Sequence, residues 1–300
     1  MTIKFTKMHG CGNDYVYVNC FEHHIEHPEQ LSVYVSDRHF GIGSDGLVLI
    51  MPSETCDFRM RMFNADGSEA QMCGNASRCV AKYCYDNHLT SKEEFTLETL
   101  AGVKVLRVTV GADGKVEKVR VYMGEPILKP YNVPVALPGM TDAPVVDQLL
   151  PLPPAVSSLY PAEPRATCVS MGNPHAVYFL GSKEAVENLP LEQIGPAFEN
   201  HAYFPARINS EFVYVYDRRH ARMRVWERGS GETWACGTGS CATLVACVLN
   251  GLTDRHITLD LNGGSLDLEW DEQTNCVFMT GPATKVFEGT IEVKTFASFS

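Results

Sequence analysis

Short runs of alternating hydrophobic and polar residues predict a chain built mainly of strands, with two helices that each begin at a Cys-Gly pair. In residues 58–62 a phenylalanine and two methionines alternate with two arginines, which is the period of a half-buried strand. Further strands are predicted at residues 3–8, 15–18, 47–51, 103–110 and 116–123, and helices at residues 28–39 and 73–88.

The second half of the chain repeats this pattern at a displacement of 163 residues, which places Cys236 on Cys73. The same displacement matches the Arg-Met-Arg of residues 222–224 to that of 59–61, Glu232 to Glu69, Gly237 to Gly74 and Ser240 to Ser77. Strands are predicted at residues 176–180, 212–216 and 222–226, a helix at 236–249, and hairpin strands within 256–295. Residues 241–249 are apolar on nearly every side, which is typical of a helix buried all round by sheet.

These patterns predict an α+β fold of two pseudo-symmetric halves, each a mixed or antiparallel sheet rolled around a central helix. The predicted halves are residues 1–125, with Cys73, and residues 165–300, with Cys236. Between them, residues 126–164 hold ten of the seventeen prolines and show no sustained period. We therefore expect this proline-rich segment to be an ordered or semi-rigid connector rather than a core element.

Composition narrows the classes of function and the surroundings of the protein. A net charge of −11 argues against a nucleic-acid partner, which requires clustered Lys and Arg. The N-terminal residues lack the apolar core of a signal peptide, and no apolar run approaches the roughly 18 residues of a membrane span. The eleven cysteines are scattered and lack paired Cys-x-x-Cys spacing, so we expect a reduced, cytoplasmic protein without a metal site. No flavin, nicotinamide or pyridoxal signature is present, and no cofactor is expected.

The two repeated cysteines are the candidates for chemistry, because each stands at the start of a helix. Unpaired N–H groups and the positive end of the helix dipole lower the pKa of a thiol and can bind a carboxylate. If the two halves face each other across a pseudo-twofold axis, a thiolate and a thiol flank one substrate carbon from opposite faces. A proton can then leave one side and return to the other. The other nine cysteines are expected to be ordinary small core residues.

Several motifs resemble the diaminopimelate epimerase family along nearly the whole chain. They are the Gly-Asn-Asp loop at Gly12, residues 64–79, the Gly-Asn-Pro-His of residues 172–175, Asn209, and residues 227–241. Proline racemases share the two-cysteine logic but typically have Cys-Gly-His and Ser-Pro-Cys-Gly-Thr, where this chain has Cys-Gly-Asn and Ala-Cys-Gly-Thr. The resemblance implies a cofactor-independent epimerase of LL- and meso-diaminopimelate, in lysine and cell-wall precursor synthesis, that forms a homodimer.

The resemblance also implies roles for individual residues. Cys73 and Cys236 exchange the roles of base and acid, and the reacting carboxylate binds backbone N–H groups around Gly74, Asn75, Gly237 and Thr238. Arg228 grips the distal carboxylate of the substrate, while Asn13, Asn64, Asn173 and Asn209 are further substrate contacts. Glu227 faces an ammonium group of the substrate or assists proton transfer beside Cys236, and His175 does the same beside Cys73.

Two departures from the family pattern and three alternatives remain. Gly46 stands where some members have Gln, and Ala76 where Gly is more usual.

One alternative is a racemase or epimerase of another amino acid such as a hydroxyproline, although Arg228 and the asparagines favour a substrate with a charged distal end. Another is a catalytically silent binding protein, which predicts loss of a cysteine. The third is a redox protein in which Cys73 and Cys236 pair, a bond that removes both base and acid.

Overall fold

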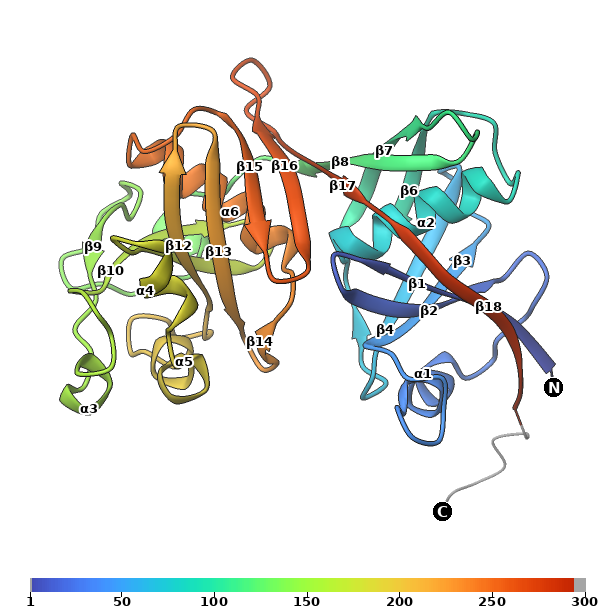
Figure 1. Ribbon diagram of the computed structural model, residues 1–300, viewed down its shortest axis with the longest axis horizontal. Coiled ribbons are helices and arrows are strands. Elements are labelled where there is room, and N and C mark those ends of the chain that lie inside the picture. Colours follow the sequence, from blue (N-terminus) through green and yellow to red (C-terminus); the bar gives the residue numbers. More distant parts are fainter. Residues whose placement is uncertain (1, 294–300) are drawn as a thin grey trace. The chain divides into compact units, whose positions relative to one another are not determined.

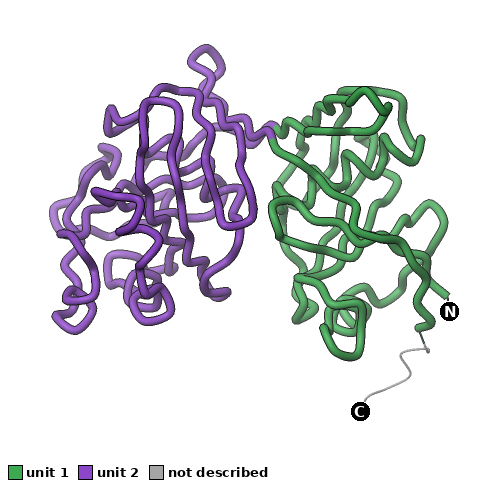
Figure 2. Tube along the Cα trace, viewed as in Figure 1, with its two compact units in different colours: residues 1–121, 281–300 green, residues 122–280 purple. Residues whose placement is uncertain are grey.

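A computed structural model describes residues 2–293, and their contacts divide the chain into two compact units (Figure 2). Unit 1 holds the described residues up to Val121 and from Gly281, and unit 2 holds Tyr122–Thr280. The predicted halves placed all of residues 165–300 together. The last strand lies in unit 1 because it pairs along the first strand of the chain, from Thr2 with Glu292 to His9 with Thr284.

Unit 1 is one sheet with two helices in its crossover connections (Figure 1). Its strands lie in the order β18-β1-β2-β3-β4-β6-β7-β8, with β5 also on β4, and only the β2–β3 and β4–β6 pairs are parallel. The elements are β1 (Thr2–Gly10), β2 (Asn13–Asn19), α1 (Pro28–Ser36), β3 (Gly46–Met51), β4 (Phe58–Asn64), β5 (Glu69–Ala70), α2 (Gly74–Asp86), β6 (Glu94–Thr99), β7 (Gly102–Val110), β8 (Val116–Gly124) and β18 (Thr284–Glu292).

Unit 2 repeats this arrangement. Its order is β9-β10-β11-β12-β13-β15-β16-β17, with β14 also on β13, and the parallel pairs β11–β12 and β13–β15 again carry the crossover helices. The elements are η1 (Pro130–Asn132), β9 (Gln148–Leu149), α3 (Pro154–Ser157), β10 (Arg165–Ser170), β11 (Pro174–Phe179), α4 (Lys183–Glu187), α5 (Leu191–Glu199), β12 (Asn209–Asp217), β13 (His220–Glu227), β14 (Gly231–Thr233), α6 (Gly237–Leu249), β15 (His256–Leu261), β16 (Gly264–Trp270) and β17 (Val277–Pro282). The predicted α+β fold of two pseudo-symmetric halves is confirmed.

The central helix of each unit is buried along most of its length. All residues of α6 from Gly239 to Cys247 are buried, as the all-round apolar sequence predicts, and α2 is buried from Gly74 to Ala81. Apolar residues on every face of α6 exclude water from the helix, so its end groups become the places where polar chemistry can occur. The predicted helix at residues 28–39 ends at Ser36, because the Asp37 carboxylate accepts hydrogen bonds from the backbone N–H groups of His39 and Phe40.

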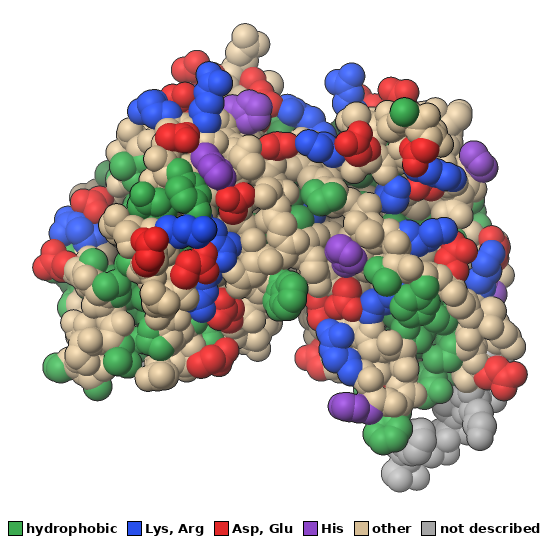
Figure 3. Space-filling model, in the orientation of Figure 1, with side chains coloured by type: hydrophobic (Ala, Val, Ile, Leu, Met, Phe, Trp, Pro, Cys, Tyr) green, Lys and Arg blue, Asp and Glu red, His purple; other side chains and the backbone are tan. Residues whose placement is uncertain are grey.

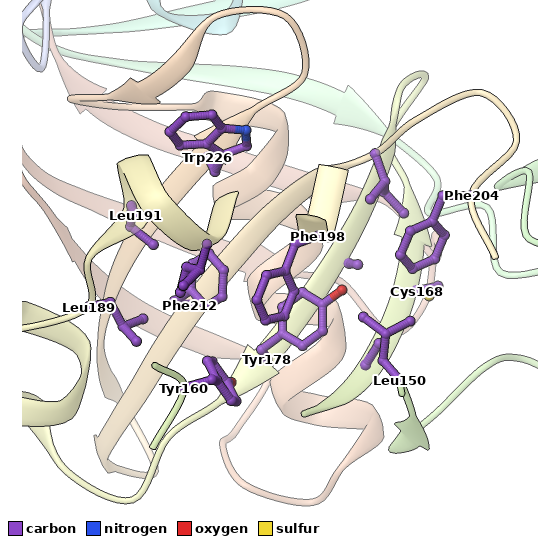
Figure 4. Close-up of a cluster of buried hydrophobic side chains, with 14 of the residues drawn as sticks. Leu150, Tyr160, Cys168, Tyr178, Leu189, Leu191, Phe198, Phe204, Phe212 and Trp226 are labelled. Atoms are coloured by element: carbon purple, nitrogen blue, oxygen red, sulfur yellow. The ribbon is translucent and has the colours of Figure 1, made fainter. Parts of the chain in front are cut away.

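The proline-rich segment was expected to lie outside the core, and this prediction was wrong. Five of its residues are buried in the main cluster of unit 2: Val133, Val135, Val145, Leu150 and Tyr160. Tyr160 packs its ring against Phe198 and Phe212, beside Tyr178 (Figure 4). Prolines hide the spacing of these apolar residues, because they replace a regular strand or helix period with a series of turns.

The described residues contain no helix long and apolar enough to cross a membrane. On the face drawn in Figure 3, acidic and basic side chains are interspersed over both units rather than gathered by sign. The hairpin strands predicted within 256–295 are β15 to β18, and residues 294 and 295 lie outside the described residues.

Replacing Tyr160 by Ala is expected to lower the free energy of unfolding by about 3 kcal/mol, because the ring is 5% exposed and leaves a cavity among aromatic side chains. Tyr131→Ala is the matched control in the same segment. Its ring is 65% exposed, so a change of no more than about 0.5 kcal/mol is expected. Denaturant titration of both variants measures the difference, and equal effects would contradict a core role for the segment.

Candidate active site

The two repeated cysteines occupy the same position at the start of the two central helices. Cys73 is the N-cap of α2 and Cys236 the N-cap of α6, both with extended backbone angles. In each unit the serine four residues later donates both its backbone N–H and its hydroxyl to the cysteine carbonyl. The atoms are 2.9 and 3.0 Å apart for Ser77, and 2.9 and 2.7 Å apart for Ser240. These hydrogen bonds fix the first turn of the helix. The backbone N–H groups between the cysteine and the serine remain at the N-terminal end of the helix hydrogen-bond pattern.

A repeated ion pair holds the hairpin that leads into each cysteine. Arg61 grips Glu69 through two hydrogen bonds of 2.7 and 2.9 Å, and Arg224 grips Glu232 through two of 2.8 and 2.9 Å. Two parallel N–H···O bonds from a planar guanidinium fix both distance and orientation. The loop before each cysteine is therefore anchored to its sheet by the same contact.

In unit 1, a tight turn brings Asn13 to Cys73. Cys11 and Gly12 form the two-residue turn between β1 and β2, both at positive φ (53° and 82°), the geometry that fits the twist of a hairpin. Asn13 then opens β2, and its Oδ1 lies 3.3 Å from the Cys73 sulfur and 3.4 Å from Nδ2 of Asn75. Its own Nδ2 donates to Asp45, 2.9 Å away. The predicted residues Asn13, Cys73 and Asn75 thus form one hydrogen-bonded group.

A fully buried arginine lies beneath this group. Arg78 donates to Oδ1 of Asn75 at 2.9 Å, to the Pro282 carbonyl at 3.1 Å and to the Cys11 sulfur at 3.6 Å. Gly10 leaves room for it, because a Cβ there would lie 2.9 Å from Nη2 of Arg78. A permanent positive charge is therefore built into the first turns of α2.

In unit 2, Cys236 is buried and its sulfur is held within the first turn of α6. The sulfur accepts from the Gly239 N–H at 3.4 Å and lies 3.5 Å from the Thr238 hydroxyl. Burial, followed by the negative charges of Glu227 and Glu211, raises the pKa of Cys236 well above its usual range, although these two hydrogen bonds act in the opposite direction. The environment of unit 2 therefore favours the thiol form at this helix start.

A buried histidine–glutamate pair lies beside Cys236. Nδ1 of His175 is 2.7 Å from Oε1 of Glu211, Nε2 is 3.0 Å from Oδ1 of Asn173, and neither side chain of the pair is exposed. His175 was predicted to act beside Cys73. In the structure, a ring nitrogen of His175, a carboxylate oxygen of Glu211 and the Cys236 sulfur lie within 4.8 Å of one another. Its relation to Cys73 stays a prediction.

Glu211 was missed by the sequence reasoning. It stands on β12, whose other residues from Asn209 to Val213 are buried as in an ordinary apolar strand. Burial raises the pKa of Glu211, with the charge and hydrogen bond of His175 opposing the shift. The signal available in the sequence was the repeat itself, because the same displacement that aligns the cysteines aligns this acid with the apolar Val48.

Glu227 ends β13, and Arg228 follows it. Glu227 accepts a short hydrogen bond from the Thr233 hydroxyl, and burial raises the pKa of its carboxyl even though part of the side chain is accessible. Arg228 donates Nη1 to the Ala206 carbonyl at 2.9 Å and its backbone N–H to Oδ1 of Asn209 at 2.9 Å. Asn209 also donates to the Pro174 carbonyl at 2.8 Å, so it ties β11, β12 and the end of β13 together.

Asn64 has a different setting from the other predicted asparagines. It ends β4 and its amide donates to the Ser68 hydroxyl at 3.0 Å, a contact that closes the turn before β5. No hydrogen bond among the described residues joins it to Cys73, and its predicted contact with substrate stays a prediction. At Gly46, a Cβ would lie 2.0 Å from the Phe63 carbonyl oxygen. Any larger residue there would need a shifted backbone.

The described residues offer one group of donors close enough to share a metal ion, namely His175, Glu211 and Cys236. Two of the three, His175 and Glu211, are already joined by the 2.7 Å hydrogen bond. A metal ion bound there would have to replace the proton that joins them.

The sequence matches the profile of the family described as Diaminopimelate epimerase over residues 5–129 and 167–286, which leaves out most of the proline-rich segment. A curated protein of that name from Acetivibrio thermocellus is 57% identical over 299 residues, covering 97% of this chain and 99% of the relative. Proteins of the same name from Agathobacter rectalis and Methanococcus maripaludis are 56% and 55% identical, each covering 97% of this chain and 100% of the relative.

The chain belongs to the diaminopimelate epimerase family.

More distant solved structures share the fold. A PhzF-family phenazine biosynthesis protein from Bacillus anthracis is similar with a TM-score of 0.72 at 15% identity, covering 98% of this chain and 100% of the neighbour. A probable proline racemase from Agrobacterium radiobacter has a TM-score of 0.66 at 15% identity, covering 98% of this chain and 93% of the neighbour. At such identities the likeness shows the architecture, and the family assignment rests on the close relatives.

The differing burial of the thiols of this family member predicts a selective alkylation. Iodoacetamide at neutral pH is expected to modify the partly exposed Cys73 in folded, reduced protein, and to spare Cys79, Cys168 and Cys247. Burial raises the pKa of those three thiols to about 12, so almost no thiolate is present to react. Peptide mass spectrometry measures each site, with denatured protein as the control in which all sites react. Equal labelling of Cys73 and Cys247 in folded protein would contradict this assignment.

Proposed function

We propose that this chain interconverts LL- and meso-diaminopimelate without a cofactor, and that Cys73 and Cys236 are the base and acid that exchange the α-proton. The observation that carries the proposal is the equivalence of the two thiols. Each is the N-cap of a central helix, inside a family whose close relatives bear the name of this activity. One thiol per unit supplies the two groups that inversion at carbon requires.

The proposed reaction inverts one carbon by removing and returning a proton. A thiolate takes the α-proton, the C–H electron pair remains on the carbon as a carbanion, and the other thiol gives its proton to the opposite face. Each forward step leaves one cysteine with an additional proton and the other without one. The α-proton is a very weak acid, so the carbanion needs oriented donors and exclusion of water.

Backbone N–H groups at the two helix starts are the proposed donors to the reacting carboxylate. Gly74 and Asn75 follow Cys73, and Gly237 and Thr238 follow Cys236. Their amides lie within the first turn of each helix, where the helix dipole favours an anion. The same dipole stabilises a thiolate, so one feature of the fold serves both the base and the substrate.

The distal amino-acid group of the substrate is recognised by charged and amide side chains. Arg228 keeps donors beyond its bond to Ala206, and a guanidinium fork fits a carboxylate. Glu227 lies near Cys236 and is the proposed partner of a substrate ammonium group or of the proton on that sulfur. Asn13, Asn64, Asn173 and Asn209 complete the proposed set, with Asn209 acting mainly by holding Arg228 in place.

The setting proposed for the enzyme is the cytoplasm, where thiols stay reduced. In the described structure all eleven cysteines are thiols and not disulfides, as a mechanism that needs both a thiolate and a thiol requires. A homodimer is implied by the family resemblance.

Proton NMR of LL-diaminopimelate with reduced protein in D₂O tests the reaction and the substrate together. The expected result is appearance of the meso isomer with deuterium at the α-carbon, without added cofactor. Absence of exchange with folded, reduced protein would overturn the proposed substrate, and exchange of proline or hydroxyproline instead would favour the racemase alternative.

Replacing either Cys73 or Cys236 by Ser is expected to slow epimerisation on the order of 10²–10⁴-fold, because a hydroxyl is a far weaker acid and base than a thiol at neutral pH. The partly exposed Cys56 provides the control, since Cys56→Ser removes a thiol outside the two helix starts. The NMR assay measures all three variants. A Cys236 variant as active as the Cys56 variant would rule out the two-thiol mechanism.

Replacing Arg228 by Met is expected to raise KM for diaminopimelate roughly 10- to 100-fold with a smaller change in kcat. A charge-assisted hydrogen bond to the distal carboxylate is worth about 1.5–3 kcal/mol in both ground and transition states. Arg219→Met is the control, because that side chain is 84% exposed and pairs weakly with Asp254. Steady-state kinetics separate the two constants, and an unchanged KM would remove Arg228 from substrate recognition.

A further inference from the structure

Glu211 places an acid where the matching position of the other unit holds an apolar residue. The displacement of 163 residues aligns Glu211 with Val48, and both side chains are fully buried. The surrounding strands correspond as well, since Val48 pairs with Met62 on β4 and Glu211 with Val225 on β13. The fold therefore accepts valine at this position, and the acid in unit 2 is not required for packing.

The carboxylate is also incompletely satisfied. Oε1 of Glu211 contacts His175, whereas Oε2 is buried without a hydrogen-bond partner among the described residues. A buried carboxylate oxygen without a donor lowers stability, which a purely structural residue would avoid. Oε1 points to the start of α6, because a Cβ built on Gly239 would lie 2.6 Å from it and 3.2 Å from the Cys236 sulfur.

The order of acidity in this cluster decides where its negative charge resides. Carboxyl and imidazolium groups are far stronger acids than a thiol in water, and all three groups here are buried together. Burial raises the pKa of both Glu211 and Cys236, and the thiol starts from the higher ordinary value, so the carboxyl of Glu211 is the group that carries the negative charge. The resulting charge lies within 4.8 Å of the sulfur and opposes a second negative charge there.

The other ionisable groups around Glu211 do not cancel this charge. Those that interact with it are His175 and Tyr178 on β11, Cys168 on β10, Glu227 on β13 and Cys236 at the start of α6. Of these, only His175 can carry a positive charge, and it is the partner already counted in the pair. Glu227 adds to the negative field at Cys236.

We propose that Glu211 is a positioning residue of the epimerisation: its buried carboxylate, placed beside the Cys236 sulfur, holds Cys236 as the thiol in the resting enzyme. This role rests on the proposed function, because it makes Cys236 the group that starts as the acid. An isomer whose α-proton faces Cys73 meets an enzyme that is ready to return a proton from Cys236.

The test follows the ionisation of Cys236 without substrate. The rate of iodoacetamide alkylation at Cys236, read by peptide mass spectrometry, is measured from pH 6 to pH 11 in wild type and Glu211→Gln. The midpoint of the variant is expected to fall by roughly one to two pH units, the effect of one buried charge a few ångströms away. The pH at which epimerisation declines on the alkaline side is expected to fall with it, a shift that loss of packing alone would not cause.

Glu187→Gln is the control, because it removes the same charge from an ion pair with Arg222 elsewhere in unit 2 and should leave the midpoint unchanged. Glu211→Val, which installs the residue of the matching position, is the second variant should the Gln variant fail to fold. A midpoint that does not fall in a folded Glu211 variant overturns the proposal.

Wild-type protein supplies a further check that needs no variant. Its Cys236 midpoint is expected above the value of about 8.5 for an ordinary thiol, and a midpoint below that value overturns the proposal. The proposed function is tested separately. Absence of deuterium exchange into diaminopimelate would reject the reaction, whatever midpoint pH the alkylation of Cys236 shows.

Discussion

A helix enclosed by sheet buries its apolar side chains, but the backbone N–H donors of its first turn have no hydrogen-bond partner within the helix. This constraint organises both units. The strands cover most of α2 and α6, so the helix starts at Gly74 and Gly237 become places where polar chemistry is concentrated. A cysteine at the N-cap puts a polarisable, ionisable sulfur at each of these points. In each unit, the crossover connections, the anchored hairpin and the hydrogen bonds of the serine hold the first turn of the central helix in place.

The two units share the backbone arrangement at the start of the central helix but differ in the buried charges around it. Unit 1 buries the guanidinium of Arg78 in the first turns of α2, and the matching residue of unit 2 is the uncharged Cys241. Unit 2 buries the carboxyl of Glu211, and the matching residue of unit 1 is Val48. A cation favours a thiolate and an anion favours a thiol, so duplication of one fold has produced two helix starts with opposite electrostatic character.

Much of this could be predicted from the sequence because the repeat is local and gapless around the cysteines. The displacement of 163 residues identified both helix starts, and the all-round apolar stretch of α6 indicated a helix enclosed by sheet. Glu211 escaped notice because its importance depends on the parallel pairing of β11 with β12, which brings His175 to Asn209 and so to the acid two residues on. A single acid in an apolar strand carries no such information by itself. Tyr160 and the valines of the proline-rich segment were hidden for a related reason, since their burial is set by the elements they pack on rather than by any period of their own.

Unit 2 is inserted within unit 1: the chain leaves through β8 and returns through β17, and β18 then completes the sheet beside β1. During synthesis, unit 2 is available in full before unit 1 is. The ribosome must release nearly the whole chain before Thr284 to Glu292 can cover the open edge of β1, so the first strand made waits for the last. An uncovered strand edge is a template for wrong strand pairing. Truncation near the C-terminus would therefore damage unit 1, which contains the N-terminal strand, rather than unit 2, which lies immediately before β18 in the sequence.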